Sequence, residues 1–222
     1  MQANSRAIVS NQEGIHKDLE SIVLKHKNSQ FLKPIAEHSR QAFEQICQFV
    51  QFSDVDKTVS KPIIFDACCG VGESSRQLAQ KFPDHCVIGV DKSADRLNRQ
   101  GREDYPNLML LRADLNDLYR LLVDSQMPIS QHKIYYPNPW PKSQHIKRRW
   151  HGAPVFKQIV QLCPNIELRS NWLIYLQEFQ AGLTLYSIKS QLSTIENPLP
   201  AITPFEAKYH ASGQTLYCLQ TL

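Results

Sequence analysis

The chain has 222 residues, of which 42% are hydrophobic and 21% are charged, and its formal net charge is +4. This length suits one large α/β domain with a short extra segment, and the composition is typical of a globular protein rather than a disordered one. No apolar run approaches the roughly 20 residues that cross a bilayer, and the first residues lack a secretory signal pattern. We therefore expect a cytoplasmic protein without a membrane partner.

The first 60 residues are predicted to form helices. Ile15, Leu19, Ile22 and Val23 lie on one stripe, and apolar residues recur at helical spacing again between residues 35 and 52. A polar stretch then ends the region. We expect residues 1–60 to be an N-terminal helical extension and residues 61–222 to be the main domain.

From residue 61 onward, short apolar runs alternate with helical patterns. The expected strands cover residues 63–68, 86–91, 108–114, 133–137 and 166–170. The expected helices cover residues 73–82, 94–101, 115–124, 154–163 and 172–180. Two last strands, 184–188 and 215–222, are expected to form an antiparallel hairpin. This order predicts a Rossmann-like α/β fold with a mostly parallel, twisted sheet covered by helices on both faces.

Six cysteines occur, and their spacing does not indicate a metal site. The sequence contains no CxxC pair and no cysteine–histidine cluster with the spacing of zinc ligands. Most of the cysteines lie in apolar stretches. We expect reduced thiols and no metal.

Acidic residues end the first three predicted strands, at Asp66, Asp91 and Asp114. Ligands of open α/β sheets bind at the carboxyl ends of parallel strands, so these side chains are candidate ligand contacts. The loop after the first strand carries Gly70 and Gly72, which let the backbone turn sharply and approach a ligand. A carboxylate at position 91 can accept hydrogen bonds from ribose hydroxyls, and Asp114 or the next two backbone groups can meet an adenine edge.

The glycine loop indicates S-adenosylmethionine (SAM) rather than a dinucleotide. A dinucleotide fingerprint needs a third glycine, but Ser75 stands there, and Asp66 would repel a pyrophosphate. The same carboxylate suits the cationic SAM. The loop resembles the (Asp/Glu)-x-Gly-x-Gly-x-Gly motif of class I SAM methyltransferases, with Cys68 in place of the first glycine. The candidate cofactor-binding residues are Asp66, Cys68, Gly70, Gly72, Asp91, Asp114, Leu115 and Asn116.

A proline-rich loop and a basic run follow the fourth strand. Three prolines stiffen the loop around Asn138 and Trp140, and no acidic residue occurs between Lys133 and His151. Such a loop can hold an amide and an aromatic ring over a base while the basic run binds phosphates. A stiff surface loop before a solvated basic helix is the alternative that the residues leave open.

These residues resemble the tRNA (guanine-N7)-methyltransferase family. Residues 137–149 match its Pro-Asp-Pro-Trp-Pro-Lys loop and basic stretch, residues 170–175 its Thr-Asp-Trp…Tyr, and residues 203–213 its Thr-x-(Tyr/Phe)-Glu-x-Lys…Gly segment. The resemblance implies that Asn138, the candidate catalytic residue, lies between SAM and the target base. It implies substrate contacts for Lys142, Asn171, Thr203 and Glu206. It implies RNA phosphate contacts for Lys147, Arg148 and Arg149.

Two positions depart from the family pattern. Asn138 and Asn171 stand where the family has aspartates, so each carboxylate is replaced by one acceptor and one donor. Methyl transfer to guanine N7 needs no general base, because this nitrogen has a free lone pair. The resemblance therefore predicts methylation of tRNA at guanine N7. A methyltransferase acting on another base or a small molecule, and a non-catalytic SAM- or RNA-binding protein, stay open as alternatives.

Overall fold

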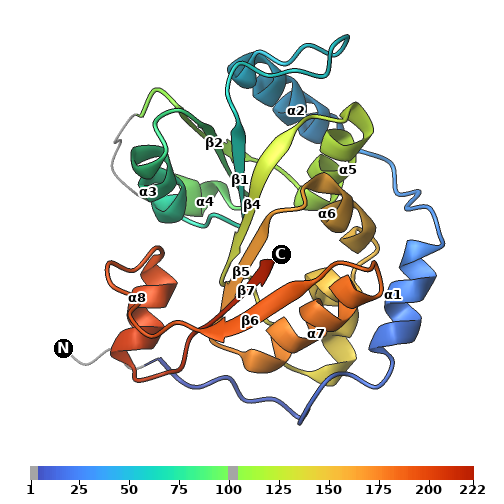
Figure 1. The fold of residues 1–222 in the computed structure, drawn as a ribbon, viewed down its shortest axis with the longest axis vertical. Helices are drawn as coiled ribbons and strands as arrows, with labels where there is room; N and C mark the ends of the chain where they lie inside the picture. The colour runs from blue at the N-terminus through green and yellow to red at the C-terminus, as the bar shows by residue number, and fades with distance from the viewer. Residues whose placement is uncertain (1–4, 100–104) are drawn as a thin grey trace. The chain divides into compact units, whose positions relative to one another are not determined.

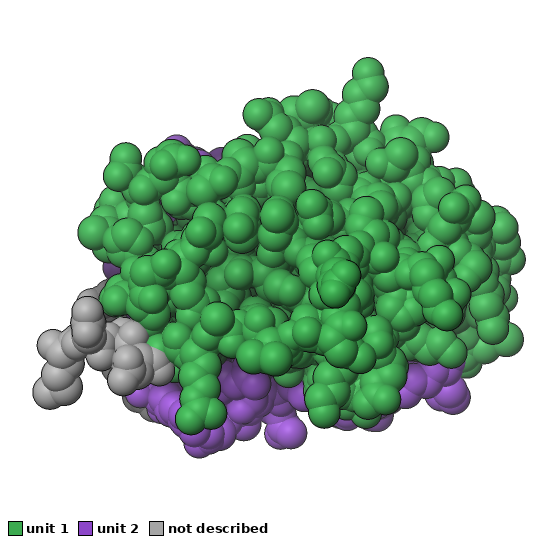
Figure 2. Space-filling view, turned by 90° about the horizontal axis from the view of Figure 1, so that it is seen from below, with its two compact units in different colours: residues 1–32, 135–160, 166–222 green, residues 33–134, 161–165 purple. Residues whose placement is uncertain are grey.

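The computed structural model describes residues 5–99 and 105–222. The chain forms two compact units, coloured green and purple in Figure 2. Unit 1 comprises residues 1–32, 135–160 and 166–222, and unit 2 comprises residues 33–134 and 161–165. This division differs from the expected boundary at residue 60, because the two helices of the N-terminal region belong to different units.

Four parallel strands form the sheet of unit 2. They are β1 (Ile63–Ala67), β2 (Cys86–Asp91), β3 (Leu108–Arg112) and β4 (Ile129–Tyr135). β1 pairs with β2 on one side and with β4 on the other, and β3 pairs with β2. Every residue of β1 and β2 is buried, as expected for central strands that are covered on both faces.

Helices cover both faces of the unit 2 strands. These helices are α2 (Glu37–Val50), α3 (Glu73–Lys81), α4 (Ala94–Leu97) and α5 (Leu115–Ser125). Figure 1 shows α3 and α4 on one side of the strands and α2 and α5 on the other. The helix α2 buries Ala42, Ile46 and Val50 along one face. The expected helix 94–101 is shorter in the structure, because α4 ends at Leu97, and the expected positions 100 and 101 lie outside the described residues.

Unit 1 combines three antiparallel strands with helices. The strands are β5 (Ile166–Ser170), β6 (Ser190–Thr194) and β7 (Tyr217–Thr221), and β7 pairs with both of the others. The helices are α1 (Leu19–Lys27), α7 (Leu173–Thr184) and α8 (Pro204–Ala211), with short 3₁₀ turns η1 (Ser143–Arg148) and η2 (Trp150–Gly152). Helix α7 packs on the three strands, and α1 packs on α7. The remaining helix, α6, spans Phe156–Leu162.

One strand prediction was wrong. Residues 184–188 were expected to be a strand, but α7 continues to Thr184 and a turn follows it. Ser187 has a φ of 63°, and the backbone N–H of Ile188 donates to the carbonyl of Leu183. The apolar residues after Thr184 therefore close the end of a helix, and the strand begins only at Ser190. The predicted fold class, a mostly parallel sheet with antiparallel pairing near the C-terminus, is confirmed.

Candidate functional site

The loop after β1 has the backbone that close approach of a ligand requires. Cys68, Gly70 and Gly72 have positive φ angles of 62°, 61° and 80°. A Cβ on Gly72 would lie 2.6 Å from a methyl carbon of Leu110, whereas one on Gly70 would meet no atom within 4 Å. The backbone of Gly70 therefore borders open space. Glycine adopts this left-handed conformation freely, whereas for Cys68 it costs about 1–3 kcal/mol.

Asp66 is fully buried beneath the start of α3. Its Oδ2 accepts hydrogen bonds from the hydroxyls of Ser74 and Ser75, each at 2.6 Å. Gly89 permits this close packing, since a Cβ there would lie 2.2 Å from the hydroxyl oxygen of Ser75. Asp66 thus ties α3 to β1 and fixes the loop that joins them. Its direct contact with SAM stays a prediction.

Asp91 connects the end of β2 to the glycine loop. Its Oδ2 accepts the N–H of Gly70 at 3.1 Å and a guanidinium N–H of Arg96 at 3.1 Å, and its Oδ1 accepts the N–H of Ser93 at 2.8 Å. The structure therefore brings two of the predicted cofactor residues into direct contact. A carboxylate has about four acceptor positions, and these three bonds occupy three of them. The contact of Asp91 with a ligand stays a prediction.

Asp114 caps the first turn of α5. Its Oδ1 accepts the N–H of Asn116 at 2.9 Å and the side-chain amide of Asn116 at 3.0 Å. Partial burial opposes ionisation of Asp114, but these hydrogen bonds and the nearby Lys33 outweigh it and lower its pKa. The backbone N–H of Ala113 donates to the Asp91 carbonyl at 3.3 Å, which links the ends of β2 and β3. Leu115 is buried at the start of α5.

Residues 136–142 of unit 1 form the proline loop, in which Asn138 is exposed and lies two positions before Trp140. The Oδ1 of Asn138 accepts the N–H of Trp140 at 3.4 Å. The ring of His145 meets the Trp140 ring edge-on at 5.6 Å, and the Arg148 guanidinium lies 4.7 Å from its centre. Lys142, Lys147 and Arg148 are exposed. An exposed amide, an indole ring and three cations are thus carried by one loop and the turn that follows it.

The expected phosphate contact of Arg149 was wrong. Its side chain is 0% exposed, unlike those of Lys147 and Arg148. The guanidinium pairs with Glu178 at 2.5 Å, and its nitrogens also donate to the carbonyls of Trp140 and Lys142. A buried guanidinium with these partners has no surface to offer a phosphate, so Arg149 holds the proline loop from inside.

Thr203 and Glu206 form the cap of α8. The Thr203 hydroxyl accepts the N–H of Glu206 at 3.0 Å, and Glu206 is 1% exposed. The Glu206 carboxylate pairs with Arg169 at 3.2 Å and accepts the hydroxyl of Tyr136 at 2.7 Å. Burial and the adjacent Glu206 raise the pKa of Tyr136, which therefore donates as a neutral phenol. Sequence reasoning missed Arg169, whose signal is a charged residue inside a short apolar strand.

Asn171 makes its side-chain hydrogen bond outside the group formed by Thr203, Glu206 and Arg169. Its side-chain amide donates to Gln214 at 2.8 Å, and Gln214 in turn donates to the carbonyl of Ser5 at 2.9 Å. The predicted cofactor residues thus belong to unit 2 and the predicted substrate residues to unit 1. Within unit 1 the structure joins Thr203 to Glu206 but shows no bond from Asn171 to either of these residues.

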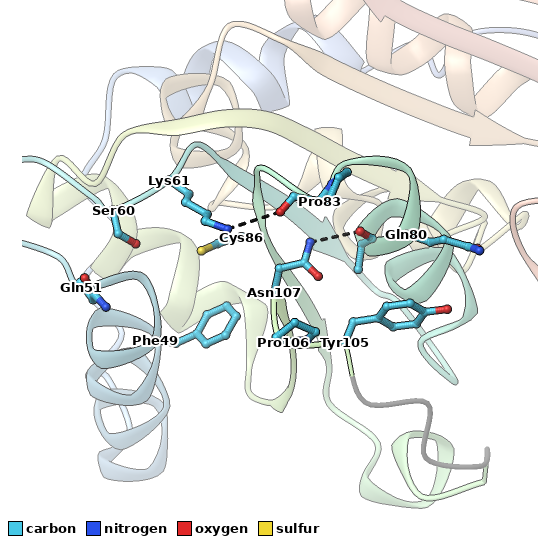
Figure 3. Close-up of a pocket in the computed structure, with 11 residues that line it drawn as sticks. Phe49, Gln51, Ser60, Lys61, Gln80, Pro83, Cys86, Tyr105, Pro106 and Asn107 are labelled. Atoms are coloured by element: carbon cyan, nitrogen blue, oxygen red, sulfur yellow. Dashed lines mark hydrogen bonds between the residues drawn. The ribbon is translucent and has the colours of Figure 1, made fainter.

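A cavity of about 430 Å³ lies in unit 2, away from the predicted cofactor residues. It is lined by residues next to the amino ends of β1, β2 and β3, including Lys61, Cys86 and Asn107 (Figure 3). Lys61 donates to the carbonyl of Pro83, and the Asn107 amide donates to three backbone carbonyls. These polar groups are used to hold the loop before β2, so they do not indicate a ligand.

Neither a membrane span nor a metal cluster was found in the described part of the chain. No helix among residues 5–99 and 105–222 is long and apolar enough to cross a bilayer. The same residues hold no group of three or more histidine, cysteine, aspartate or glutamate side chains that could bind a metal. All six cysteines are free thiols, and burial raises the pKa of Cys69 well above its usual value.

The parallel strands, their acidic ends and the glycine loop define a class I SAM-methyltransferase fold. The chain belongs to the family described as "Putative methyltransferase", whose model matches residues 60–219. It is 28% identical over 178 residues to the tRNA (guanine-N(7)-)-methyltransferase of Pediococcus pentosaceus, covering 72% of this chain and 81% of that protein. It is 25% identical over 206 residues to the tRNA (guanine-N(7)-)-methyltransferase of Limosilactobacillus reuteri, covering 83% and 92%. The predicted enzyme class and family resemblance are confirmed.

Solved structures show the same fold. A mutant 16S rRNA (adenine(1408)-N(1))-methyltransferase from Catenulisporales acidiphilia, solved with cosubstrate SAM, superposes with a TM-score of 0.55 at 16% sequence identity. The match covers 76% of this chain and 88% of that one. At this identity the likeness bears on the fold alone, and it agrees with the class that the strands and the glycine loop define.

Proposed function

We propose that this protein transfers a methyl group from SAM to N7 of a guanine in tRNA. The observation that carries the proposal is the proline loop with the turn that follows it, where Asn138, Lys142, Lys147 and Arg148 are exposed and the half-buried Trp140 ring lies against Arg148. The relatives from Pediococcus pentosaceus and Limosilactobacillus reuteri bear the name of this activity. Exposed cations suit a polyanionic substrate, and a partly accessible indole suits a base that leaves its stack.

The residues of unit 2 fit SAM as the methyl donor. The Gly70 backbone borders open space, and the neighbouring carboxylate of Asp91 has an acceptor position for a ribose hydroxyl. Asp114 stays ionised because its pKa is lowered, so its carboxylate remains a hydrogen-bond acceptor for the adenine edge. When bound, SAM supplies a methyl group on a positively charged sulfur. The set Asp66, Cys68, Gly70, Gly72, Asp91, Asp114, Leu115 and Asn116 is our proposed cofactor site.

The residues of unit 1 are proposed to hold the target nucleotide. Asn138 would contact the base, with Lys142 and Asn171 as further substrate contacts. Thr203 and Glu206 are mostly buried, so we assign them a supporting part: they fix α8 and the Tyr136 hydroxyl. Guanine N7 already has a free lone pair and no proton to remove. The side chains therefore need only orient the base, and proximity supplies the rate.

The proposed substrate and the family match lead to proposals on where the protein acts and on the roles of its two sequence regions. Because tRNA is the proposed substrate, we propose that the protein acts in the cytoplasm. The family model begins at residue 60, which supports residues 61–222 as the methyltransferase domain and residues 1–60 as a helical extension. The proposed partner is tRNA, with SAM as the cosubstrate.

The test is transfer of radiolabelled methyl from SAM to bulk tRNA from cells that lack this protein, followed by nucleoside analysis. We expect label in 7-methylguanosine. Label in another nucleoside would move the activity to a different base. No label, with SAM binding intact by calorimetry, would refute the enzyme assignment and favour a binding protein. Asn138→Asp and Asn171→Asp would then show whether the two amides are the reason.

A further inference from the structure

The proline loop is held in a strained backbone conformation. Tyr136, at its start, and Trp140, within it, have positive φ angles of 50° and 46°. Neither residue is glycine, and such a conformation costs about 1–3 kcal/mol for each residue. Strain of this kind persists only where surrounding contacts determine the backbone. The contacts that hold the loop therefore decide where Asn138 points.

The buried guanidinium of Arg149 supplies the inner contacts. Its Nε and one terminal nitrogen donate to the carbonyl of Trp140 at 3.2 and 3.1 Å, and the latter also reaches the carbonyl of Lys142 at 3.4 Å. The other terminal nitrogen of the Arg149 guanidinium donates to the carboxylate of Glu178, which also accepts a hydrogen bond from the His151 ring at 2.8 Å. Burial would raise the pKa of Glu178, but these partners lower it to about 2, so the carboxylate stays charged.

The N-terminal segment supplies the outer contacts. The Gln12 side-chain carbonyl accepts from two nitrogens of Arg149 at 3.2 Å each, and its amide donates to Glu178 at 2.5 Å. The Ser10 hydroxyl donates to the carbonyl of Pro141 at 2.6 Å, and Asn11 accepts the N–H of Ser143 at 3.0 Å. Residues 10–12 thus bond to the proline loop directly and to the Arg149–Glu178 pair that supports it.

We infer that Gln12 and Arg149 are positioning residues for methyl transfer, because together they set the strained loop that carries Asn138. This inference rests on the proposed function. Arg149 binds the loop carbonyls, Glu178 neutralises Arg149, and Gln12 bridges both members of that pair. Neither Gln12 nor Arg149 needs to touch the substrate for this role. A part of the chain before the family match thereby takes part in the reaction.

Gln12→Ala is the first test, because Gln12 is only partly buried and leaves the Arg149–Glu178 pair in place. A shift of the loop would misalign guanine N7 with the methyl group of SAM. We therefore expect kcat to fall at least about tenfold, with the KM values for tRNA and SAM unchanged. Hydrogen exchange gives a second readout that needs no activity. The N–H groups of Trp140 and Ser143 are expected to exchange faster in the variant.

Two further variants make the test specific. Arg149→Lys keeps the charge opposite Glu178 but lacks the planar fork that reaches both loop carbonyls, so we expect it to show the same loss of kcat. Gln180→Ala is the matched control. The Gln180 side chain is partly buried, and its amide donates to Ser190 and to no residue of the proline loop in the described part of the chain. This control is expected to keep wild-type kcat and wild-type exchange.

Other results would overturn the inference. Unchanged kcat and unchanged exchange in Gln12→Ala would show that the loop does not depend on the segment. A raised KM for tRNA with unchanged kcat would make Gln12 a binding residue instead. If the wild-type protein transfers no methyl group, the proposed function fails, and the exchange rates of Trp140 and Ser143 still decide whether Gln12 sets the loop.

Discussion

Replacing Lys147 or Arg148 by alanine is expected to weaken tRNA binding and to reduce its dependence on salt. Both side chains are exposed on the turn that follows the proline loop. A cation that neutralises one phosphate displaces about one counterion, so its loss lowers the slope of log Kobs against log[salt] by about 1. The double replacement is expected to lower the slope by about 2, which is about 1 for each of the two proposed phosphate contacts.

Arg149 is expected to behave differently although it is the next residue in the chain. Its guanidinium is 0% exposed and pairs with Glu178. Arg149→Gln combined with Glu178→Gln removes one charge of each sign and leaves the net charge unchanged. We expect this double variant to keep the wild-type salt slope. Circular dichroism would first show that both double variants are folded.

The assay is fluorescence anisotropy of a labelled, unmodified tRNA transcript at salt concentrations from about 50 to 200 mM, where such contacts change affinity strongly. Lys189→Ala is the control, because Lys189 is also exposed in unit 1 but lies after α7, away from η1 in sequence. Equal slopes for wild type and the Lys147–Arg148 variant would refute the phosphate contacts. A slope reduced in the Arg149–Glu178 variant would refute the structural role of Arg149.

Three further predictions follow from buried or exposed groups. Burial lowers the pKa of His132 to about 3, so between about pH 6.5 and 3 the unfolded state binds a proton at His132 that the native state does not. Its contribution should lower the unfolding free energy by about 1.4 kcal/mol for each pH unit over that range, and His132→Gln should remove this contribution in urea titrations. Gly89→Ala forces a Cβ against the Ser75 hydroxyl and should destabilise by about 1–3 kcal/mol in thermal melts, whereas Gly14→Ala, with open space around it, should be neutral. Asn138→Ala should lower kcat about tenfold through loss of one hydrogen bond to the base, with tRNA affinity unchanged; a changed affinity at constant kcat would contradict its proposed role.

The strands of unit 2 could be predicted because their signal is local. The run Ile63–Ala67 is buried on both faces, and the backbone after it turns with positive φ angles at Cys68 and Gly70. The acidic ends of such runs led to the proposed ligand edge for the same reason. Asp91 and Gly70 lie 21 residues apart, yet parallel pairing brings adjacent strand ends together, and the structure shows a hydrogen bond between them.

The parts that could not be predicted depend on distant partners. Lys147, Arg148 and Arg149 look alike in sequence, and only the last is buried, because Glu178 approaches it from α7 and Gln12 from the N-terminal segment. Local spacing contains no information about either approach. The wrong strand at residues 184–188 has a similar cause, since apolar residues that close a helix end look like a short strand.

In unit 1 three glutamates are buried and the cations of the proline loop and its turn are exposed, which bears on the asparagine at position 138. Among the described residues of unit 1, the three buried glutamates are each paired with a cation: Glu178 with Arg149, and Glu167 and Glu206 with Arg169. The exposed positions of the proline loop and its turn carry only amides and cations. An aspartate at position 138 would add a negative charge to the loop that carries Lys142 and weaken the attraction of a polyanion. The amide of Asn138 therefore favours phosphate binding, while guanine must be recognised with fewer charge-assisted hydrogen bonds.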